Sequence, residues 1–221
     1  MSGLPTFEGL LPPTVRLASG RIVDRTAELI GAEDEAIARA VDSRRAEYAT
    51  GRVFARSLLE SLGAPRVPLL REPDTRLPLW PDAFVGSITH SDALCVVAVA
   101  RATDHAGVGL DVEPDAPTDS EIERVVLRDH EHDWVGQGAG ADPEERSRRC
   151  RLVFSAKEAV YKAFYPRTRT FWSFQDVVLD LDLEAGSFEA SLPESAGRAK
   201  ATGLVVRREG WIFSAVALPP D

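Results

Sequence analysis

Apolar residues recur at the spacing of an α-helix in three parts of the chain. The first predicted helix runs from about residue 31 to residue 62, and Gly63 followed by Pro65 favours its end there. Two further helices are predicted over 119–135 and over 146–165, with a Gly-rich loop between them. Helices therefore occupy both halves of the chain.

Other apolar runs are short and predict strands. The residues before position 100 form one continuous apolar run, which is typical of a buried strand, and the run that Pro114 ends alternates apolar residues with Gly, Asp and Glu. Gly210 separates the last two runs and favours a hairpin. The predicted strands are 87–100, 106–114, 176–183, 203–209 and 211–218. Because helices and strands mix in both halves, the pattern is compatible with an α+β chain of two lobes, and we expect these lobes at 1–105 and 106–221.

Composition and charge exclude several classes of protein. The chain has 221 residues and a net charge of -9, which disfavours a general nucleic-acid binder because such a protein needs a basic surface. No apolar run reaches the ~18 residues of a membrane span, and the N-terminus lacks the basic start and apolar core of a signal peptide. Cys95 and Cys150 are the only cysteines, too few for a disulfide framework. We therefore expect a cytoplasmic protein that binds neither nucleic acid nor a membrane.

Two acidic residues interrupt the predicted strand over 106–114. Asp111 and Glu113 are two apart, so their side chains share one face of a strand, and Gly107 and Gly109 on the same face leave room for a ligand. Solvated positions at the edge of a sheet would also explain the two acids. The alternative is a site for a hard cation, since Mg²⁺ takes one or two protein carboxylates together with phosphate oxygens and water.

The segment FSAKEAVYKAF (154–164) stands out by its lysines. The chain contains 23 Arg and only three Lys, yet Lys157 and Lys162 both lie in this segment. Ser155 with Glu158 fits a capping box, and Glu158 with Lys162 fits an i,i+4 pair, so a stable helix alone explains three of these residues. Lysine is also a compact charge that suits a phosphate, and Glu158 is a third carboxylate for the cation site.

These segments resemble the signature motifs of a known family. GVGLDVEP (107–114), followed about 40 residues later by FSAKEAVYKAF, is similar to the paired motifs of the 4′-phosphopantetheinyl transferases. WPDAFVGSITHS (80–91) and RRAEYATGRVFARSLLESLG (44–63) resemble motifs of the subgroup related to enterobactin synthase component D and its actinobacterial relatives. The resembling segments run from about residue 44 to residue 174, which is more than half of the chain.

The resemblance implies a fold and a reaction. The implied fold has two similar α+β lobes with pseudo-twofold symmetry in one chain, with the active site between them. In the implied reaction, a serine hydroxyl of an apo acyl or peptidyl carrier protein attacks the β-phosphorus of coenzyme A, phosphopantetheine moves to the serine, and 3′,5′-ADP leaves. Mg²⁺ is the implied cofactor, and the resemblance to the subgroup favours a carrier protein of secondary metabolism or siderophore synthesis. The repeat within one chain favours a monomer.

The resemblance also implies roles for individual residues. Asp111, Glu113 and Glu158 would be the metal ligands, and Lys157 and Lys162 would neutralise phosphate oxygens. Glu158 and Lys162 would be the catalytic residues, with Glu158 as the base that takes the serine proton. The residues expected to contact the nucleotide end of coenzyme A are Arg45, Arg52, Arg56, Arg76 and His90, with Arg71 as the alternative to Arg76.

The same residues allow other functions. A Mg²⁺-dependent hydrolase of the coenzyme A pyrophosphate would use the same ligands, with water in place of the serine. A protein that only holds coenzyme A or a carrier is disfavoured, because all three carboxylates and both lysines are present. Carrier proteins are usually acidic, so docking needs a local basic surface; RSRRCR (146–151) with FYPRTRTFW (164–172) is one candidate, and a solvated basic run is the alternative.

Overall fold

The structure is a computed structural model that describes residues 5, 7, 9–140 and 142–220. The chain divides into two compact units, one formed by 1–108 with 219–221 and the other by 109–218. Residues 106–108 and 219–221 group with the first unit, whereas the expected boundary after residue 105 assigned them to the second. No helix in the described residues is both long enough and apolar enough to cross a membrane.

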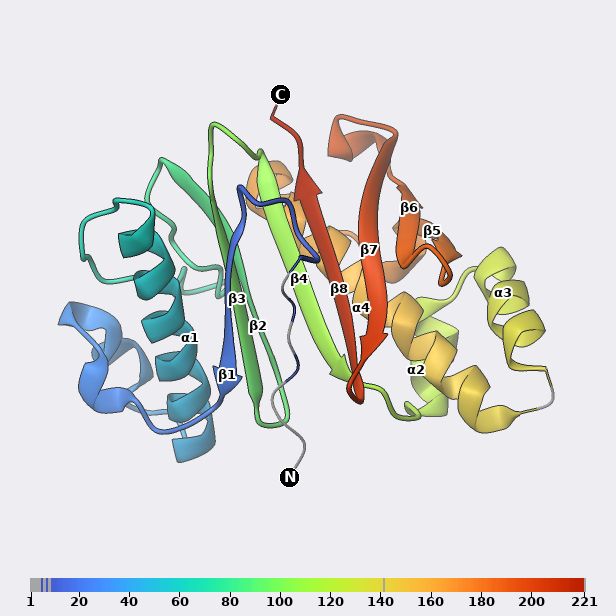
Figure 1. Cartoon of the computed structure of the whole chain (residues 1–221), viewed down its shortest axis with the longest axis horizontal. Helices are drawn as coiled ribbons and strands as arrows, with labels where there is room; N and C mark the ends of the chain where they lie inside the picture. The colour runs from blue at the N-terminus through green and yellow to red at the C-terminus, as the bar shows by residue number, and fades with distance from the viewer. Residues whose placement is uncertain (1–4, 6, 8, 141, 221) are drawn as a thin grey trace. The chain divides into compact units, whose positions relative to one another are not determined.

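The first unit is a three-stranded antiparallel sheet with one long helix against it. Its strands are β1 (Arg16–Arg21), β2 (Phe84–Ser91) and β3 (Leu94–Arg101), in the order β1-β3-β2. Helix α1 (Asp42–Ser61) packs against β3 (Figure 1). Three short 3-10 helices precede α1, at Thr26–Glu28, Gly31–Glu33 and Glu35–Ile37. The core between helix and sheet is apolar and includes Ala55, Leu58, Leu59, Val97 and Val99.

Two predictions for this unit are wrong in part. The helix predicted over 31–62 starts as 3-10 turns and is α-helical only from Asp42, although it ends near Gly63 as expected. The single strand predicted over 87–100 is a hairpin, because Asp92 adopts a positive φ of 48° and reverses the chain between β2 and β3.

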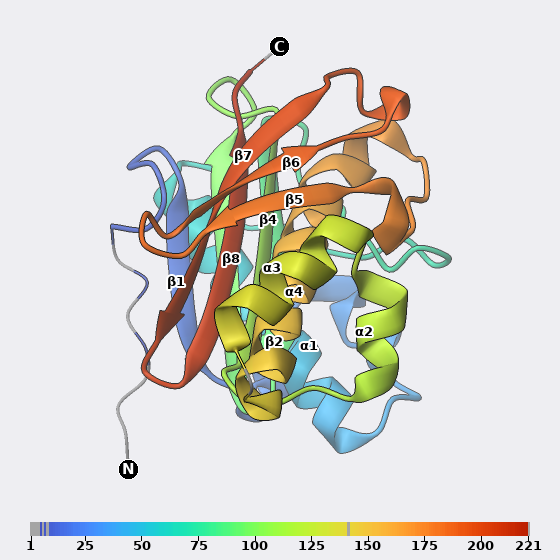
Figure 2. The same ribbon diagram turned by 90° about the vertical axis from the view of Figure 1, so that its right-hand side faces the viewer.

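The second unit is a five-stranded sheet with three helices. The strands run in the order β4-β8-β7-β6-β5 and comprise β4 (Gly107–Pro114), β5 (Val178–Asp182), β6 (Ser187–Ser191), β7 (Lys200–Arg208) and β8 (Trp211–Leu218). Helix α4 (Pro143–Thr168) packs against β8, and α2 (Ser120–Val126) and α3 (Asp129–Ala139) pack against α4 (Figure 2). Two 3-10 turns complete the unit, η4 (Phe174–Asp176) and η5 (Glu194–Ala196).

The two units share one plan, in which the first strand pairs with the second strand of a hairpin. The order β1-β3-β2 with α1 corresponds to β4-β8-β7 with α4. The hairpin predicted at Gly210 is confirmed, since Glu209 and Gly210 both have positive φ angles, 53° and 83°, between β7 and β8. Two similar mixed units confirm the predicted α+β class.

Helix α4 is longer than predicted, and this changes the interpretation of its sequence. Asp142 caps its N-terminus by accepting a hydrogen bond of 2.9 Å from Glu144 N, and Pro143 occupies the first turn. Ser155 therefore lies in the middle of the helix, fully buried, and its Oγ has no hydrogen-bond partner among the described residues. The capping box predicted for Ser155 and Glu158 is wrong.

Candidate active site

Strand β4 and helix α4 lie in direct contact at Gly109. A Cβ at this position would lie 1.9 Å from Ala159 O and 2.6 Å from Ala163 N, so only glycine lets the two backbones approach this closely. The close approach brings Asp111 on β4 into hydrogen-bond contact with Lys162 on α4. A glycine in the strand motif thus sets the distance between the two signature segments.

Asp111, Glu158 and Lys162 form one charged group, which we call the Asp111 cluster. Lys162 Nζ lies 2.7 Å from Asp111 Oδ1 and 4.0 Å from Glu158 Oε2, and Asp111 is only 4% exposed. Burial by itself lowers the pKa of Lys162, but the carboxylates of Asp111 and Glu158 outweigh it and leave that pKa above its ordinary value. Lys162 therefore stays a cation in this cluster at neutral pH.

Glu158 is a carboxylate whose surroundings favour its protonated form. Burial raises its pKa above the ordinary value, the Lys162 ammonium opposes this rise, and the Asp111 carboxylate adds to it. A glutamate with a raised pKa accepts a proton more readily than a solvated glutamate does. This property separates Glu158 from an ordinary solvated helix glutamate.

A hard cation fits the chemistry of these donors. Glu113 is partly buried, and its Oε2 lies 4.0 Å from Arg151 Nη1. The carboxylates of Asp111, Glu113 and Glu158 exceed the charges of Lys162 and Arg151 by one negative charge. No three or more His, Cys, Asp or Glu side chains of the described residues are grouped closely enough to hold a metal ion, so the expected trio is not gathered as a ready ligand set. Mg²⁺ needs only one or two protein carboxylates, which these residues supply.

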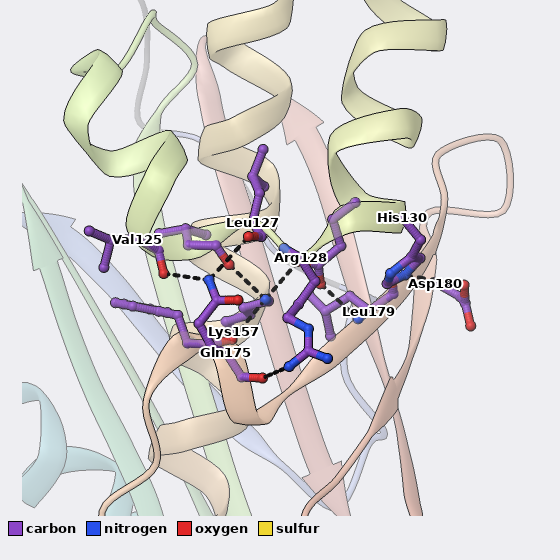
Figure 3. A network of polar contacts seen from close by, with 11 residues as sticks. Val125, Leu127, Arg128, His130, Lys157, Gln175, Leu179 and Asp180 are labelled. Carbon is purple, nitrogen blue, oxygen red and sulfur yellow. Dashed lines mark hydrogen bonds and ion pairs between the residues drawn. The ribbon is translucent and has the colours of Figure 1, made fainter.

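Lys157 does not join the Asp111 cluster. Its side chain is 1% exposed, and Nζ donates to Val126 O at 2.8 Å, Glu131 Oε2 at 2.7 Å and Phe174 O at 2.8 Å (Figure 3). An ammonium group has three N–H donors, so these three acceptors use them all. The expected contact of Lys157 with a phosphate is therefore corrected: this lysine is an internal ion-pair partner of Glu131.

A polar cavity in the first unit gathers several of the predicted nucleotide contacts. The cavity has a volume of about 440 Å³ and lies between α1, β2 and the loop that precedes β2. Its basic lining residues are Arg44, Arg52, Arg71, Arg76 and His90. Arg71 and Arg76, which the sequence left as alternatives, thus line the same cavity.

Arg52 and His90 are held differently within this cavity. Arg52 is buried, its Nε donates to Leu69 O at 2.7 Å, and its guanidinium carbon lies 4.2 Å from the centroid of the Tyr48 ring. Burial lowers the pKa of Arg52, although Tyr48 offsets part of the effect. His90 is more open, and its Nε2 lies 3.8 Å from Glu47 Oε2.

Arg45 and Arg56 do not line the cavity. The Arg45 side chain reaches the 3-10 turns that precede α1, where Nη1 donates to Ile37 O at 3.3 Å and Nη2 lies 3.4 Å from Asp34 Oδ1. Arg56 is 4% exposed and forms a buried ion pair with Glu33. Their expected contacts with the nucleotide are corrected, because both guanidinium groups face protein acceptors. Arg44, one position before Arg45, lines the cavity in its place.

A second cavity, of about 460 Å³ and mostly apolar, lies beside Glu158 in the second unit. We call it the apolar cavity; it is lined by Arg124, Val125, Lys157, Glu158, Tyr161, Phe171, Trp172, Ser173, Phe174, Gln175 and Val177. This cavity was not predicted from the sequence. The signal available was the aromatic segment FYPRTRTFW, which supplies two of its walls at Phe171 and Trp172.

The basic run over 146–151 is largely neutralised by acids of its own unit. The nearest carboxylate partners are Glu123 for Arg146, Glu144 for Arg148 at 3.4 Å, Glu145 for Arg149 at 3.3 Å and Glu113 for Arg151 at 4.0 Å. The run therefore offers little excess positive charge to an acidic partner. Its role in docking stays a prediction.

Comparisons with known proteins point to one family in both halves of the chain. Residues 32–100 match the pattern of the 4′-phosphopantetheinyl transferase N-terminal domain, and residues 107–214 match that of the 4′-phosphopantetheinyl transferase superfamily. The chain is 40% identical over 204 residues to 4′-phosphopantetheinyl transferase Svp of Streptomyces mobaraensis, covering 88% of this chain and 81% of Svp.

Two further relatives share less of the sequence. The chain is 33% identical over 181 residues to 4′-phosphopantetheinyl transferase PptT of Mycobacterium tuberculosis, covering 80% of this chain and 77% of PptT. It is 36% identical over 128 residues to enterobactin synthase component D of Salmonella typhi, covering 56% of this chain and 50% of that protein. The shared region is longer in the relatives from Streptomyces and Mycobacterium.

Proposed function

Because the chain belongs to the 4′-phosphopantetheinyl transferase superfamily, we propose that it transfers 4′-phosphopantetheine from coenzyme A to a serine of an apo carrier protein. The second product is 3′,5′-ADP. The observation that carries the proposal is the Asp111 cluster, in which a buried acid, a glutamate with a raised pKa and a lysine cation meet. Phosphoryl transfer relies on such positioned charges more than on covalent chemistry.

In the proposed step, one P–O bond forms, another P–O bond breaks and one proton is transferred. The serine oxygen bonds to the β-phosphorus of coenzyme A, the bond from that phosphorus to the bridging oxygen breaks, and its electron pair leaves with 3′,5′-ADP. Glu158 accepts the serine proton, which its raised pKa favours. Lys162 stays charged beside it and offsets negative charge on the pyrophosphate.

Mg²⁺ is part of the proposal. Asp111, with Glu113 two residues further along β4, would hold it, which leaves Glu158 free to act as the base. When bound, the ion neutralises and orients pyrophosphate oxygens. This assignment uses two carboxylates rather than the three of the sequence-based expectation, in agreement with the spread of the three side chains.

Coenzyme A has two chemically different ends, and the two cavities differ in the same way. The polar cavity, with Arg52, Arg71, Arg76 and His90, suits the adenosine with its 3′-phosphate. The apolar cavity beside Glu158 suits the uncharged pantetheine arm, which carries methyl and amide groups and a thiol. We assign each end of the substrate to the cavity that matches its charge.

The test separates transfer from hydrolysis and from simple binding. The protein is mixed with coenzyme A, Mg²⁺ and an apo peptidyl carrier domain; the carrier is then weighed by mass spectrometry and the nucleotides are separated by chromatography. The proposal predicts a phosphopantetheine adduct on the carrier and an equal amount of 3′,5′-ADP. Cleaved coenzyme A with an unmodified carrier would instead identify a hydrolase, and bound but intact coenzyme A would identify a binding protein.

The biological setting completes the proposal. The relatives include enterobactin synthase component D, so we place the carrier in secondary metabolism or siderophore synthesis. We also propose a cytoplasmic monomer, since both cysteines are free and buried and the two similar units lie within one chain. A panel of apo carriers from fatty-acid, polyketide and peptide assembly lines would rank its preference.

A further inference from the structure

Each unit contains a buried glutamate that is held in the same way. In the second unit, Glu131 is the third residue of α3 and is 0% exposed. It accepts hydrogen bonds from Arg128 N at 2.7 Å, from Leu179 N at 2.9 Å and from Lys157 Nζ at 2.7 Å (Figure 3). Lys157 also donates to Val126 O, five residues before Glu131.

The first unit repeats this pattern residue for residue. Glu33 is the third residue of its 3-10 turn and is also 0% exposed. It accepts from Ile30 N at 3.0 Å, from Leu69 N at 2.8 Å and from the Arg56 guanidinium. Arg56 Nη2 also donates to Glu28 O at 2.7 Å, again five residues before the glutamate. Lys157 is therefore the counterpart of Arg56, because each is a buried cationic residue on the long helix of its unit.

The pair in the second unit adjoins the apolar cavity, because Lys157 is one of its lining residues. Lys157 holds Phe174 O, and the next residue on α4 is Glu158. The Gln175 side chain donates to Val125 O at 2.9 Å and to Leu127 O at 3.1 Å, and Arg128 Nη1 donates to Gln175 O at 2.7 Å. These bonds tie the end of α2 and the residue before α3 to the 171–177 segment. Residues of α2, α4 and the 171–177 segment line the cavity.

The pair in the first unit supports the polar cavity instead. Glu33 holds the backbone of Leu69 through its N–H, and the carbonyl of the same residue accepts from Arg52 Nε. Arg52 lines the polar cavity, which Glu33 and Arg56 do not. In both units, a buried ion pair between a glutamate and a cationic side chain fixes a segment that contacts a cavity-lining residue.

We propose that Glu131 and Lys157 form a positioning pair that sets the wall of the apolar cavity and the place of Glu158. The pair thereby acts on the pantetheine end of coenzyme A, while Glu33 and Arg56 act on the nucleotide end. This inference rests on the proposed function, because it assigns the two ends of coenzyme A to the two cavities. None of these four residues is catalytic, because contacts within the protein occupy their charged groups.

Two matched variants test the inference, Glu131→Gln and Glu33→Gln. Both replace a fully buried carboxylate that has the same set of partners, so their losses of stability should be similar. The readout is the dissociation constant of coenzyme A and of 3′,5′-ADP, which lacks the pantetheine arm, measured by titration calorimetry. Glu131→Gln should raise the dissociation constant of coenzyme A about tenfold or more, because a small displacement of a cavity wall greatly reduces affinity. The dissociation constant of 3′,5′-ADP should stay within about twofold of the wild-type value.

Glu33→Gln should weaken both ligands by the same factor, since both carry the nucleotide end. Equal losses of the two ligands in Glu131→Gln would overturn the inference, because they would indicate general loosening of the fold. Unchanged binding of coenzyme A in a folded Glu131→Gln protein would overturn it as well. A folded protein is identified by its circular dichroism and its melting temperature.

A surface variant decides the matter if Glu131→Gln does not fold. Arg128 is exposed and outside the cavity lining, so Arg128→Ala removes its bond to Gln175 O and leaves every lining residue in place. It should raise the dissociation constant of coenzyme A about two- to fivefold and leave that of 3′,5′-ADP unchanged, as expected for one lost hydrogen bond. Equal changes for the two ligands would contradict the inference. If the wild-type protein binds both ligands but leaves every carrier unmodified, the proposed transfer fails while this binding comparison still stands.

Discussion

Replacing Lys157 by Met removes a charge that the fold needs. The Lys157 side chain is 1% exposed and Glu131 is 0% exposed, with Nζ and Oε2 2.7 Å apart. Without the ammonium, Glu131 keeps two backbone N–H donors but loses its counter-charge, and breaking a buried pair in this way costs about 3–5 kcal/mol. In a chain of this size each kcal/mol lowers the melting temperature by about 2–4 °C, so we expect a drop of about 6–20 °C.

The measurement is thermal unfolding of wild type and Lys157→Met followed by circular dichroism. Lys200→Met is the matched control, because its partner Glu189 lies at the surface and the two side chains are 61% and 40% exposed. Its melting temperature should stay within about 1 °C of the wild type, since exposed ion pairs contribute little. If Lys157→Met melted like the control and lost only its affinity for coenzyme A, Lys157 would be a phosphate ligand and our reasoning would be refuted.

Three further results are expected. The transfer rate should fall as the pH drops through the raised pKa of Glu158, above its ordinary 4.5, and Lys162→Met should move this midpoint to higher pH because Lys162 lowers that pKa. Arg76→Ser should weaken 3′,5′-ADP several-fold in calorimetry, whereas Arg45→Ser, which lies outside the polar cavity, should leave it unchanged. Gly109→Ala should destabilise the protein by about 1–3 kcal/mol in urea unfolding, because its Cβ would overlap the backbone of α4.

The raised pKa of Glu158 also has a consequence for stability. An acid with a raised pKa in the folded state binds its proton more tightly there than in the unfolded chain. The protonated Glu158 carboxyl therefore stabilises the folded state below the pKa that it has in the unfolded chain. This stabilisation is lost as the pH rises through the pKa that it has in the folded protein. The Glu158→Gln protein should accordingly be at least as stable as the wild type at pH 7, although it should be inactive. Such an exchange of activity for stability is common at functional sites.

The sequence predicted the elements that have regular patterns and missed those set by distant partners. The strand over 107–114 and the hairpin at Gly210 follow from alternation and from glycine, which act locally. The hairpin at Asp92 was missed because residues 87–100 contain no glycine or proline to mark a turn, so they were predicted as one strand. Strand β1 was not predicted, because its segment RLASGR has few apolar residues and pairs with β3 far along the chain.

The candidate site shows the same division. Asp111 and Lys162 were expected in one site because their segments resemble the paired motifs of the family, and the structure brings them within 2.7 Å. The true partner of Lys157 is Glu131, 26 residues away, and no local pattern distinguishes a lysine that faces a phosphate from one that faces a buried acid. Arg44 and Arg45 illustrate a second limit, since neighbours on a helix point about 100° apart and only the packing of α1 decides which of them faces the cavity.

The most direct test of the central claim is the mass of an apo carrier domain after one turnover with coenzyme A and Mg²⁺. Wild type and the control variant Asp180→Asn, whose carboxyl is 74% exposed in the same unit, should both convert the carrier to its phosphopantetheine form. Asp111→Asn should leave the carrier at its apo mass, because it removes the buried carboxylate that pairs with Lys162 and would hold the metal. A carrier fully modified by Asp111→Asn at the wild-type rate would contradict the assignment of the Asp111 cluster as the active site.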